Sequence, residues 1–477
     1  MADAQQSQAM NPPVAASALI PLEINVIQNP TACCVSAPIS FPLVDQGVGP
    51  ASLEALFCRT RATTVALCVP LETEDFVVQS MPDASPAKWH LAHTSWFFEQ
   101  FLLVPHLPGY QRFHDGYGLL FNSYYQGVGR AFTRAQRGLL SRPTVADVMR
   151  YRAHVDAAMV TLLNDPRRAA ESTMLTELGC HHEQQHQELL LTDIKHALSI
   201  NPLRPVYRSI RQAKPRPARA VNPGPLRFVP FDGGIVSVGH QGRDFCFDNE
   251  TPRHQVLLQP FELAQRLVTN AEYRDFVAGG GYRDAANWLS DGWAVVEQES
   301  WQRPLYWSDD CRTEFTLLGP REIDPAAPVC HISLYEADAY ARAVGARLPT
   351  EHEWESVAER ETQAGAPGGT VSGNLLEADE LRPLPSDATP AGSRGAGVEQ
   401  LFGDVWEWTQ SAYSAYPGFT PWTGSIAEYN GKFMANQFVL RGGSCVTPAS
   451  HIRATYRNFF PPHARWQFAG LRLARDC

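Results

Sequence analysis

The chain has 477 residues, of which 44% are hydrophobic and 19% are charged, and its formal net charge is −10. This composition is typical of a globular protein, and the length exceeds what one hydrophobic core serves, so we expect two domains with appendages. The acidic balance argues against a nucleic-acid partner, and no apolar run is long enough to span a membrane.

Residues 1–50 are rich in Ala, Pro, Ser and Gln and follow no sustained period, which predicts a flexible N-terminal arm. The arm contains no Lys or Arg, so a secretory signal with a basic start is not expected. The 10 cysteines are scattered without a CxxC pair. These features predict a cytoplasmic protein with reduced thiols.

Residues 51–210 show a helical pattern in four segments. The first begins near Ser52, and the second carries apolar residues from Trp89 to Phe97 behind a candidate N-cap at Ser85. The third begins at Thr144, and the fourth is the histidine-rich stretch 179–196. Four amphipathic helices with a long third connection predict a bundle, in which metal sites are built from side chains that project inward.

His182 and His186 lie one turn apart on the fourth predicted helix, so both can ligate one cation, and neutral imidazole suits Fe, Zn, Cu or Ni. A third ligand must then come from elsewhere in the chain. His93 lies on the inner stripe of the second predicted helix, whereas His90 is offset from it. The pattern therefore nominates His93, His182 and His186 as a metal site.

Two other interpretations of these histidines stay open. Histidines on an apolar helix face are often core residues that only form hydrogen bonds. The segment HEQQH also matches the H-E-x-x-H pattern of zinc hydrolases, with Glu183 as the general base. No Gly and His follow at the positions that metzincins use, and 189–226 contains no Glu that could be a third ligand. The sequence thus argues against that class.

The second half of the chain has a different sequence pattern. Prolines recur among basic residues over 211–230, which predicts a linker, and 231–477 is expected to form a loop-rich α+β domain. Helices are predicted at 334–344 and 350–359, the latter opened by a capping box of Thr350 and Glu353. Residues 361–397, rich in Gly, Ala and Pro, are predicted to be a long surface loop.

This second domain resembles the formylglycine-generating-enzyme fold, a C-type-lectin-like α+β fold. The motifs that carry the resemblance are CHISLYEADAYARAVGARLPTEHEWESVAER, LFGDVWEWT, VLRGGSC and RNFFPPHARWQFAGLRLARD. Formylglycine enzymes use two cysteines shortly after the RGGS turn. Thr447 and Ile452 stand at those positions here, so the cysteine-dependent oxidation is not expected, and function must be argued from the site.

The first domain resembles the DinB-like four-helix bundle, and the order of the two domains is similar to that of the ergothioneine-pathway sulfoxide synthases. In that family a three-histidine iron(II) site uses O2 to join a thiol to the imidazole of hercynine, the trimethylated betaine of histidine. The resemblance places the Fe2+ ligands on His93, in WHLAHTSWFFE, and on His182 and His186, in HEQQH. It also implies O2 as co-substrate.

Further positions follow from the same resemblance. Gln185 matches the residue that contacts the hercynine imidazole. Asn458 and Phe459, in YRNFF, match a pair near the betaine end, where an aromatic ring suits a quaternary ammonium. Arg134 and Arg137, in RAFTRAQRG, match an arginine pair that holds the carboxylate of the thiol substrate.

Tyr124 and Tyr125, in FNSYYQGVG, resemble the tyrosine pair of the cyanobacterial-like branch. The resemblance implies that one of them donates a proton or hydrogen atom, so that oxygen use leads to C–S bond formation rather than to oxidised free thiol. The sequence does not choose between the two. Either tyrosine could instead be structural.

Phe460 stands where the mycobacterial branch, which accepts γ-glutamylcysteine, carries an aspartate, so cysteine is the expected donor. The predicted enzyme is thus a non-haem iron oxidoreductase that makes hercynylcysteine sulfoxide from small-molecule substrates. A selenoneine synthase, which joins a selenosugar to hercynine, is the alternative, and a selenosugar would leave the arginine pair without a carboxylate to hold. A non-catalytic ligand-binding module is the remaining interpretation.

Overall fold

The computed structural model describes residues 52–209, 224–365, 371–386 and 397–477. Gly47–Cys477 form one compact unit, and the predicted arm 1–50 and most of the predicted linker lie outside the described residues. Within the described ranges, no helix combines the length and the apolarity needed to cross a bilayer.

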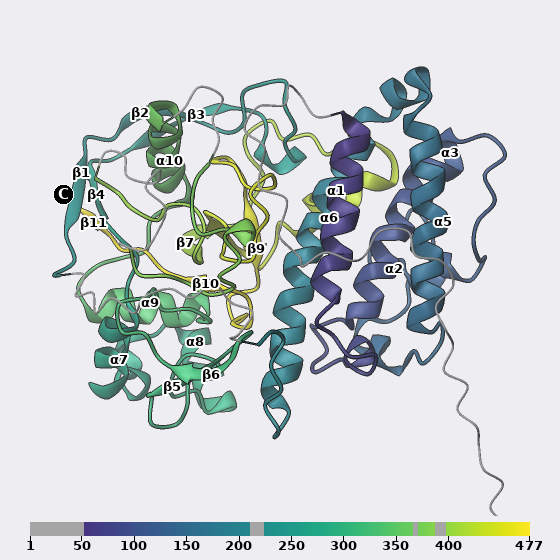
Figure 1. Cartoon of the computed structure of the whole chain (residues 1–477). Coiled ribbons are helices and arrows are strands. Elements are labelled where there is room, and N and C mark those ends of the chain that lie inside the picture. The colour runs from purple at the N-terminus through teal and green to yellow at the C-terminus, as the bar shows by residue number, and fades with distance from the viewer. Residues whose placement is uncertain (1–51, 210–223, 366–370, 387–396) are drawn as a thin grey trace, which may run out of the picture. The chain divides into compact units, whose positions relative to one another are not determined.

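Four long helices form the N-terminal bundle (Figure 1). They are α1 Leu53–Cys68, α2 Ala87–Phe98, α5 Val145–Leu163 and α6 Pro166–Ile200. A π-helical stretch at Glu99–Leu103 continues α2 into α3 Val104–His106, and α4 Tyr117–Leu120 lies in the connection that follows. The predicted bundle is therefore present in the structure.

The ends of these helices follow from local side-chain chemistry. The Ser52 hydroxyl accepts from the Ala55 amide, Thr144 and Asp147 form a capping box on α5, and the Asp165 carboxylate caps α6 ahead of Pro166. The predicted N-cap at Ser85 is wrong, because α2 starts one residue later, with Pro86 at the cap position.

The predicted order of connections also needs correction. The long connection runs from α3 to α5, so it is the second of the bundle, whereas α5 and α6 are separated only by Asn164 and Asp165. The long connection carries Tyr124, Tyr125, Arg134 and Arg137. This connection therefore contributes four of the predicted site residues.

In its described residues, the C-terminal domain contains two larger sheets and two hairpins. The antiparallel sheet β1-β4-β11 consists of Phe228–Phe231, Phe261–Ala264 and Ala474–Asp476. The sheet β10-β7-β8-β9 consists of Ala469–Gly470, Trp406–Ala412, Phe438–Arg441 and Asn458–Phe460, with β10 parallel to β7. The hairpins pair β2 Gly234–Val238 with β3 His254–Leu258, and β5 Thr313–Thr316 with β6 Gly319–Glu322.

Helices of this domain are α7 Asn270–Ala278, α8 Ser290–Glu299, α9 Leu334–Ala343 and α10 Glu351–Gly365. Single 3₁₀ turns of the chain lie at Asp75–Val77, Arg134–Leu139, Asp248–Glu250, Gly281–Arg283, Ala285–Asn287, Leu376–Ala378, Gly424–Glu428 and Gly431–Phe433. The predicted capping box is confirmed: the Thr350 amide donates to the Glu353 carboxylate at 2.7 Å, and the Glu353 amide donates to the Thr350 hydroxyl at 3.1 Å.

Two boundaries of this domain differ from the prediction. Strand β1 begins at Phe228, inside the predicted linker, because its pairing with β4 extends the sheet. The predicted surface loop 361–397 is wrong where it is described: α10 continues to Gly365, and four leucines between 371 and 386 are buried. The buried leucines are Leu375, Leu376, Leu381 and Leu384.

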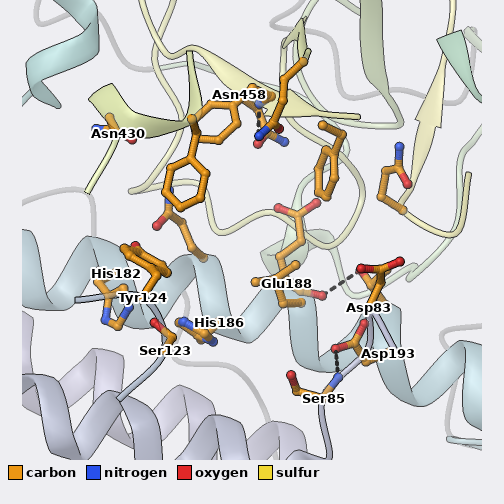
Figure 2. A pocket seen from close by; sticks show the side chains of 18 of the residues that line it. Asp83, Ser85, Ser123, Tyr124, His182, His186, Glu188, Asp193, Asn430 and Asn458 are labelled. Carbon is orange, nitrogen blue, oxygen red and sulfur yellow. Dashed lines mark hydrogen bonds between the residues drawn. The ribbon is translucent and has the colours of Figure 1, made fainter. Parts of the chain in front are cut away.

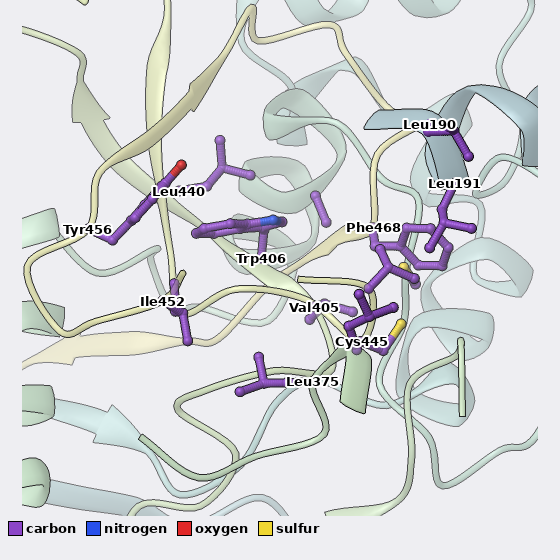
Figure 3. Close-up of a cluster of buried hydrophobic side chains, with 14 of the residues drawn as sticks. Leu190, Leu191, Leu375, Val405, Trp406, Leu440, Cys445, Ile452, Tyr456 and Phe468 are labelled. Carbon is purple, nitrogen blue, oxygen red and sulfur yellow. The ribbon is translucent and has the colours of Figure 1, made fainter. Parts of the chain in front are cut away.

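Helix α6 joins the bundle to the C-terminal domain. Leu190 and Leu191 belong to the same cluster of buried side chains as Val405, Trp406 and Phe468 (Figure 3). Burial of one leucine side chain stabilises a fold by roughly 1.5–3 kcal/mol. The apolar contacts therefore fix α6 against the C-terminal sheet, next to the turns that carry its histidines.

Candidate metal centre and substrate pocket

Three histidines from two helices meet inside the bundle. His93 comes from α2 and His182 and His186 come from α6, and their ring nitrogens lie within 4.8 Å of one another. The Nε2 atoms of His93 and His182 are 3.2 Å apart. The structure therefore brings together the three predicted ligands and places them at the spacing of a metal site.

The environment keeps these rings in the form that binds metal. Burial lowers the pKa of His182 to about 3, and burial together with neighbouring histidines lowers the pKa of His93 and His186 well below the ordinary value. His93 Nδ1 lies 2.6 Å from the Phe121 carbonyl oxygen, so Nδ1–H donates and the Nε2 lone pair faces the other two rings. Three neutral imidazoles arranged in this way fit a divalent metal ion.

Glu183 points away from this centre. Its carboxylate accepts from Arg61 at 2.8 Å, from Arg152 at 2.9 Å and from Thr64 at 2.6 Å. Burial would raise the pKa of Glu183, but the two guanidinium groups outweigh it and hold that pKa at about 2. Glu183 would be the general base of a zinc hydrolase of the H-E-x-x-H class. Here it is held in a buried ion cluster instead.

A cavity of about 550 Å³ opens beside the three histidines. Figure 2 shows His182, His186 and Tyr124 on one side of it and Asn458 on the other, with Ser85 and Asp193 further along. Ten of the eleven predicted site residues line the cavity: His93, Tyr124, Arg134, Arg137, His182, Gln185, His186, Asn458, Phe459 and Phe460. Tyr125 is the exception.

Arg137 forms a cationic wall of the cavity. Its guanidinium carbon lies 3.3 Å from the centre of the Trp89 ring, and its Nη1 donates to the Ser85 hydroxyl at 2.9 Å. Among the described residues, the buried Nε–H of Arg137 has no hydrogen-bond partner. Burial, and then the charge of Arg134, lower the pKa of Arg137 to about 9. A buried guanidinium that lines a cavity is suited to an anionic ligand.

Arg134 differs from Arg137 in exposure, although both line the cavity. It is exposed, and its guanidinium donates to the backbone carbonyl of Asp83. Of the two predicted arginines, Arg137 is therefore buried and Arg134 lies at the solvent side.

Gln185 is held by two tyrosines that the sequence analysis missed. Its Nε2 donates to Tyr456 Oη at 2.8 Å, and its Oε1 accepts from Tyr429 Oη. Tyr456 Oη in turn lies 3.0 Å from Nε2 of His451. The partners lie more than two hundred positions away from Gln185 in the sequence, so no local pattern could have pointed to them.

Aromatic rings form the wall opposite the metal centre. Phe459 stacks on Tyr413 with ring centres 4.1 Å apart and faces Phe433 at 5.8 Å. The Asn458 side chain is oriented by the Phe459 amide, which donates to its Oδ1 at 2.9 Å. Phe460 packs edge-on against Trp466 at 6.0 Å. This wall offers π faces to a ligand.

Only one of the two predicted tyrosines lines the cavity. Tyr124 does so, whereas Tyr125 is fully buried behind it among Trp96, Phe97 and Phe101. Their hydroxyl oxygens are 3.4 Å apart. Burial raises the pKa of Tyr124 to about 12, so its phenol keeps its proton at neutral pH.

Glu188 is a second residue that the sequence analysis missed. Its Oε1 accepts from Trp406 and from Ser444, and its Oε2 accepts from Thr447, each at 2.7 Å. Thr447 stands where formylglycine enzymes have their first cysteine, and here its hydroxyl anchors a cavity carboxylate. Burial raises the pKa of Glu188.

His90 was set aside in the sequence analysis, but it contacts the centre. Its Nδ1 lies 2.8 Å from Nδ1 of His186, and its Nε2 lies 3.1 Å from Oδ2 of Asp193. Because this contact uses Nδ1 of His186, Nε2 of the same ring is left for a metal ion. His90 thus belongs to the surroundings of a ligand, a role that helical spacing alone does not reveal.

The chain is similar to several known proteins. Residues 216–477 match the model of the sulfatase-modifying factor enzyme 1-like domain. Hercynine oxygenase of Mycolicibacterium thermoresistibile is 35% identical over 83% of this chain and 88% of its own length, and hercynine oxygenase of Mycobacterium tuberculosis is 33% identical over 90% and 99%. Ergothioneine biosynthesis protein 1 of Schizosaccharomyces pombe is 27% identical over 56% of this chain and 35% of its own length.

Proposed function

Because this chain belongs to the hercynine oxygenase family of ergothioneine biosynthesis, we propose that it is an iron(II)- and O2-dependent sulfoxide synthase. The reaction joins the sulfur of cysteine to the imidazole of hercynine and leaves a sulfoxide. One observation carries the proposal: the three histidines and an underused buried guanidinium, that of Arg137, line the same cavity.

His93, His182 and His186 are the proposed ligands of Fe2+, which when bound supplies the redox chemistry of O2 activation. All three are neutral, so they bind the metal without first losing a proton. They belong to two helices that are packed on each other, so the ligand set is held in place before metal and substrates arrive.

Hercynine is proposed to lie between Gln185 and the aromatic wall. The Gln185 amide uses one N–H toward Tyr456, and its second N–H remains to donate to the imidazole. Phe459 offers its ring to the trimethylammonium group through cation–π attraction. Tyr429 and Tyr456 then act by fixing the orientation of the Gln185 amide.

Cysteine is proposed as the sulfur donor, with its carboxylate on Arg137 and Arg134. The guanidinium of Arg137 lines the cavity and supplies a positive charge with N–H donors. Phe460 contributes an apolar surface with no charge for the longer γ-glutamylcysteine. A selenosugar has no carboxylate to accept these hydrogen bonds, so the Arg137 site favours cysteine over the selenoneine alternative.

Tyr124 is proposed as the proton donor, with Tyr125 as its support. The proton is held on Tyr124 Oη, at the cavity wall, and Tyr125 Oη lies behind it within hydrogen-bond reach. A phenol in this place supplies a proton or hydrogen atom to the reacting oxygen and favours C–S bond formation.

The test is anaerobic reconstitution with iron(II), followed by O2 and hercynine with cysteine, γ-glutamylcysteine and a selenosugar in competition. Mass spectrometry of the products is expected to show a hercynyl sulfoxide derived from cysteine. A selenium adduct would keep the iron assignment and overturn the donor, and iron-loaded protein that forms no adduct would overturn the proposed function.

A further inference from the structure

Asp193 lies where two hydrogen-bond chains meet. Its Oδ2 accepts from the Ser85 backbone amide at 2.8 Å and also lies 3.1 Å from Nε2 of His90. The side chain is buried, and Figure 2 shows it beside Ser85 at the edge of the cavity. One carboxylate oxygen thus contacts two different parts of the N-terminal domain, the start of α2 and the segment just before it.

The first chain leads to a proposed metal ligand. A carboxylate oxygen only accepts, so His90 Nε2–H donates to Asp193, which leaves the Nδ1 lone pair of that ring as the acceptor toward its other partner. That lone pair faces Nδ1 of His186 at 2.8 Å, so the proton of His186 belongs on Nδ1. The consequence is a lone pair on Nε2 of His186, which is the atom that the metal centre requires.

The second chain leads to the proposed carboxylate site. The same Oδ2 fixes the Ser85 backbone, and the Ser85 hydroxyl accepts from Nη1 of Arg137 at 2.9 Å. The Arg137 guanidinium therefore has a defined position relative to Asp193, sandwiched between Ser85 and the Trp89 ring. Asp193 Oδ1 has no hydrogen-bond partner among the described residues, so this side chain is held through Oδ2 alone.

We propose that Asp193 is a positioning residue that holds His186 and Arg137 in fixed relation, through His90 and Ser85 respectively. The inference rests on the proposed function, because it takes His186 as a metal ligand and Arg137 as the donor's carboxylate site. Because the two sites share one anchor, we expect metal bound at the histidines to strengthen carboxylate binding at Arg137, and the reverse.

The experiment measures two affinities on the full chain. Cobalt(II) titration, followed by its visible absorption, reports the histidine site, and calorimetry with L-serine, a carboxylate ligand without a thiol, reports the arginine site. Asp193→Ala is expected to weaken cobalt binding by roughly 10- to 100-fold and serine binding by roughly 5- to 10-fold. Serine binding to wild type is expected to tighten when cobalt is present.

Variants that break one hydrogen-bond chain at a time test the two chains separately. His90→Phe is expected to weaken cobalt binding and to change its absorption spectrum, while serine binding without metal stays unchanged. His90→Gln is expected to restore much of the cobalt affinity, because an amide oxygen can accept from His186 while the amide N–H donates to Asp193. Ser85→Ala, which keeps the backbone amide, is expected to weaken only serine binding.

Glu99→Ala is the matched control, since it truncates another buried carboxylate of the bundle, one that accepts from Tyr110 and Tyr151 outside the cavity. It is expected to leave both affinities unchanged. Cobalt and serine affinities of His90→Phe and Ser85→Ala equal to wild type would overturn the inference even if Asp193→Ala fails to fold. Wild-type protein that binds neither cobalt nor iron would overturn the proposed function itself.

Discussion

The two sides of helix α6 differ in how their buried charged groups are paired. On the bundle side, both oxygens of Glu183 accept from buried partners, Arg61, Arg152 and Thr64. On the cavity side, the buried guanidinium of Arg137 forms no ion pair among the described residues, and its partners are the Ser85 hydroxyl and the Trp89 ring.

This difference separates a structural cluster from a binding site. Buried polar groups are almost always hydrogen-bonded in folded proteins, and an orphaned group is costly. A carboxylate that is paired with two guanidinium groups contributes to folding, whereas a buried cavity guanidinium without a carboxylate partner is suited to an anionic ligand. His182 and Glu183 are adjacent in sequence but belong to opposite kinds of surroundings.

The largest expected effect is on the cavity side. His182→Ala removes one of three ligands, and we expect both bound iron and sulfoxide formation to be lost, measured by metal content per chain and by product mass. His154→Ala is the matched control, because His154 lies on α5 and does not line the cavity; its contacts are the Gln111 carbonyl and the rings of Tyr110 and Phe113. Full activity of His182→Ala would remove the metal assignment.

Glu183→Ala tests the bundle side through stability. Removal of this carboxylate leaves Arg61 and Arg152 buried without their partner, so the free energy of unfolding is expected to fall by roughly 3–5 kcal/mol. The measurement is denaturant unfolding of the metal-free protein. A stable variant that retains iron but has lost all activity would instead favour a chemical role for Glu183.

The same cluster predicts a pH dependence. The pKa of Glu183 in the fold is about 2, below its ordinary value of 4.5, so the charged form is the one that the fold favours. Its contribution, about 3 kcal/mol, is present above about pH 4.5 and is lost as the pH falls toward 2. Wild type and Glu183→Ala should therefore converge in stability at acid pH, as followed by unfolding at a series of pH values.

Arg137→Ala should act on the donor rather than on the metal. Loss of a buried guanidinium that binds a carboxylate is expected to raise KM for cysteine by roughly 10- to 100-fold, with bound iron unchanged. Arg130→Ala is the control, because Arg130 is an exposed arginine of the same connection that does not line the cavity. Equal KM values for the two variants would exclude Arg137 as the carboxylate site.

The smallest expected effect distinguishes the two tyrosines. Tyr124→Phe should keep iron in place and shift products from hercynyl sulfoxide toward oxidised free cysteine. Tyr125→Phe should shift the ratio less, since this side chain reaches the cavity only through Tyr124. Product ratios by mass spectrometry give the answer, and an unchanged ratio in both variants would end the proton-donor assignment.

Local patterns in the sequence were sufficient for the four bundle helices, for α9 and α10 and for the spacing of the histidines, but α7 and α8 were not predicted. The capping box of Thr350 and Glu353 is such a case, because all its determinants lie within four residues. The i, i+4 spacing of His182 and His186 likewise guarantees a common helix face. The cavity position of Phe459 could be expected only through resemblance to a family.

The tertiary structure determined the features that depend on contacts between residues far apart in the sequence. Helical spacing set His90 apart from His93, yet packing of α2 on α6 places His90 between His186 and Asp193. The two adjacent tyrosines could not be distinguished by sequence. The packing of the long connection places Tyr124 in the cavity wall and Tyr125 in the core. Hydrogen bonds that cross from one domain to the other have no period or motif, so they become visible only once the chain has folded.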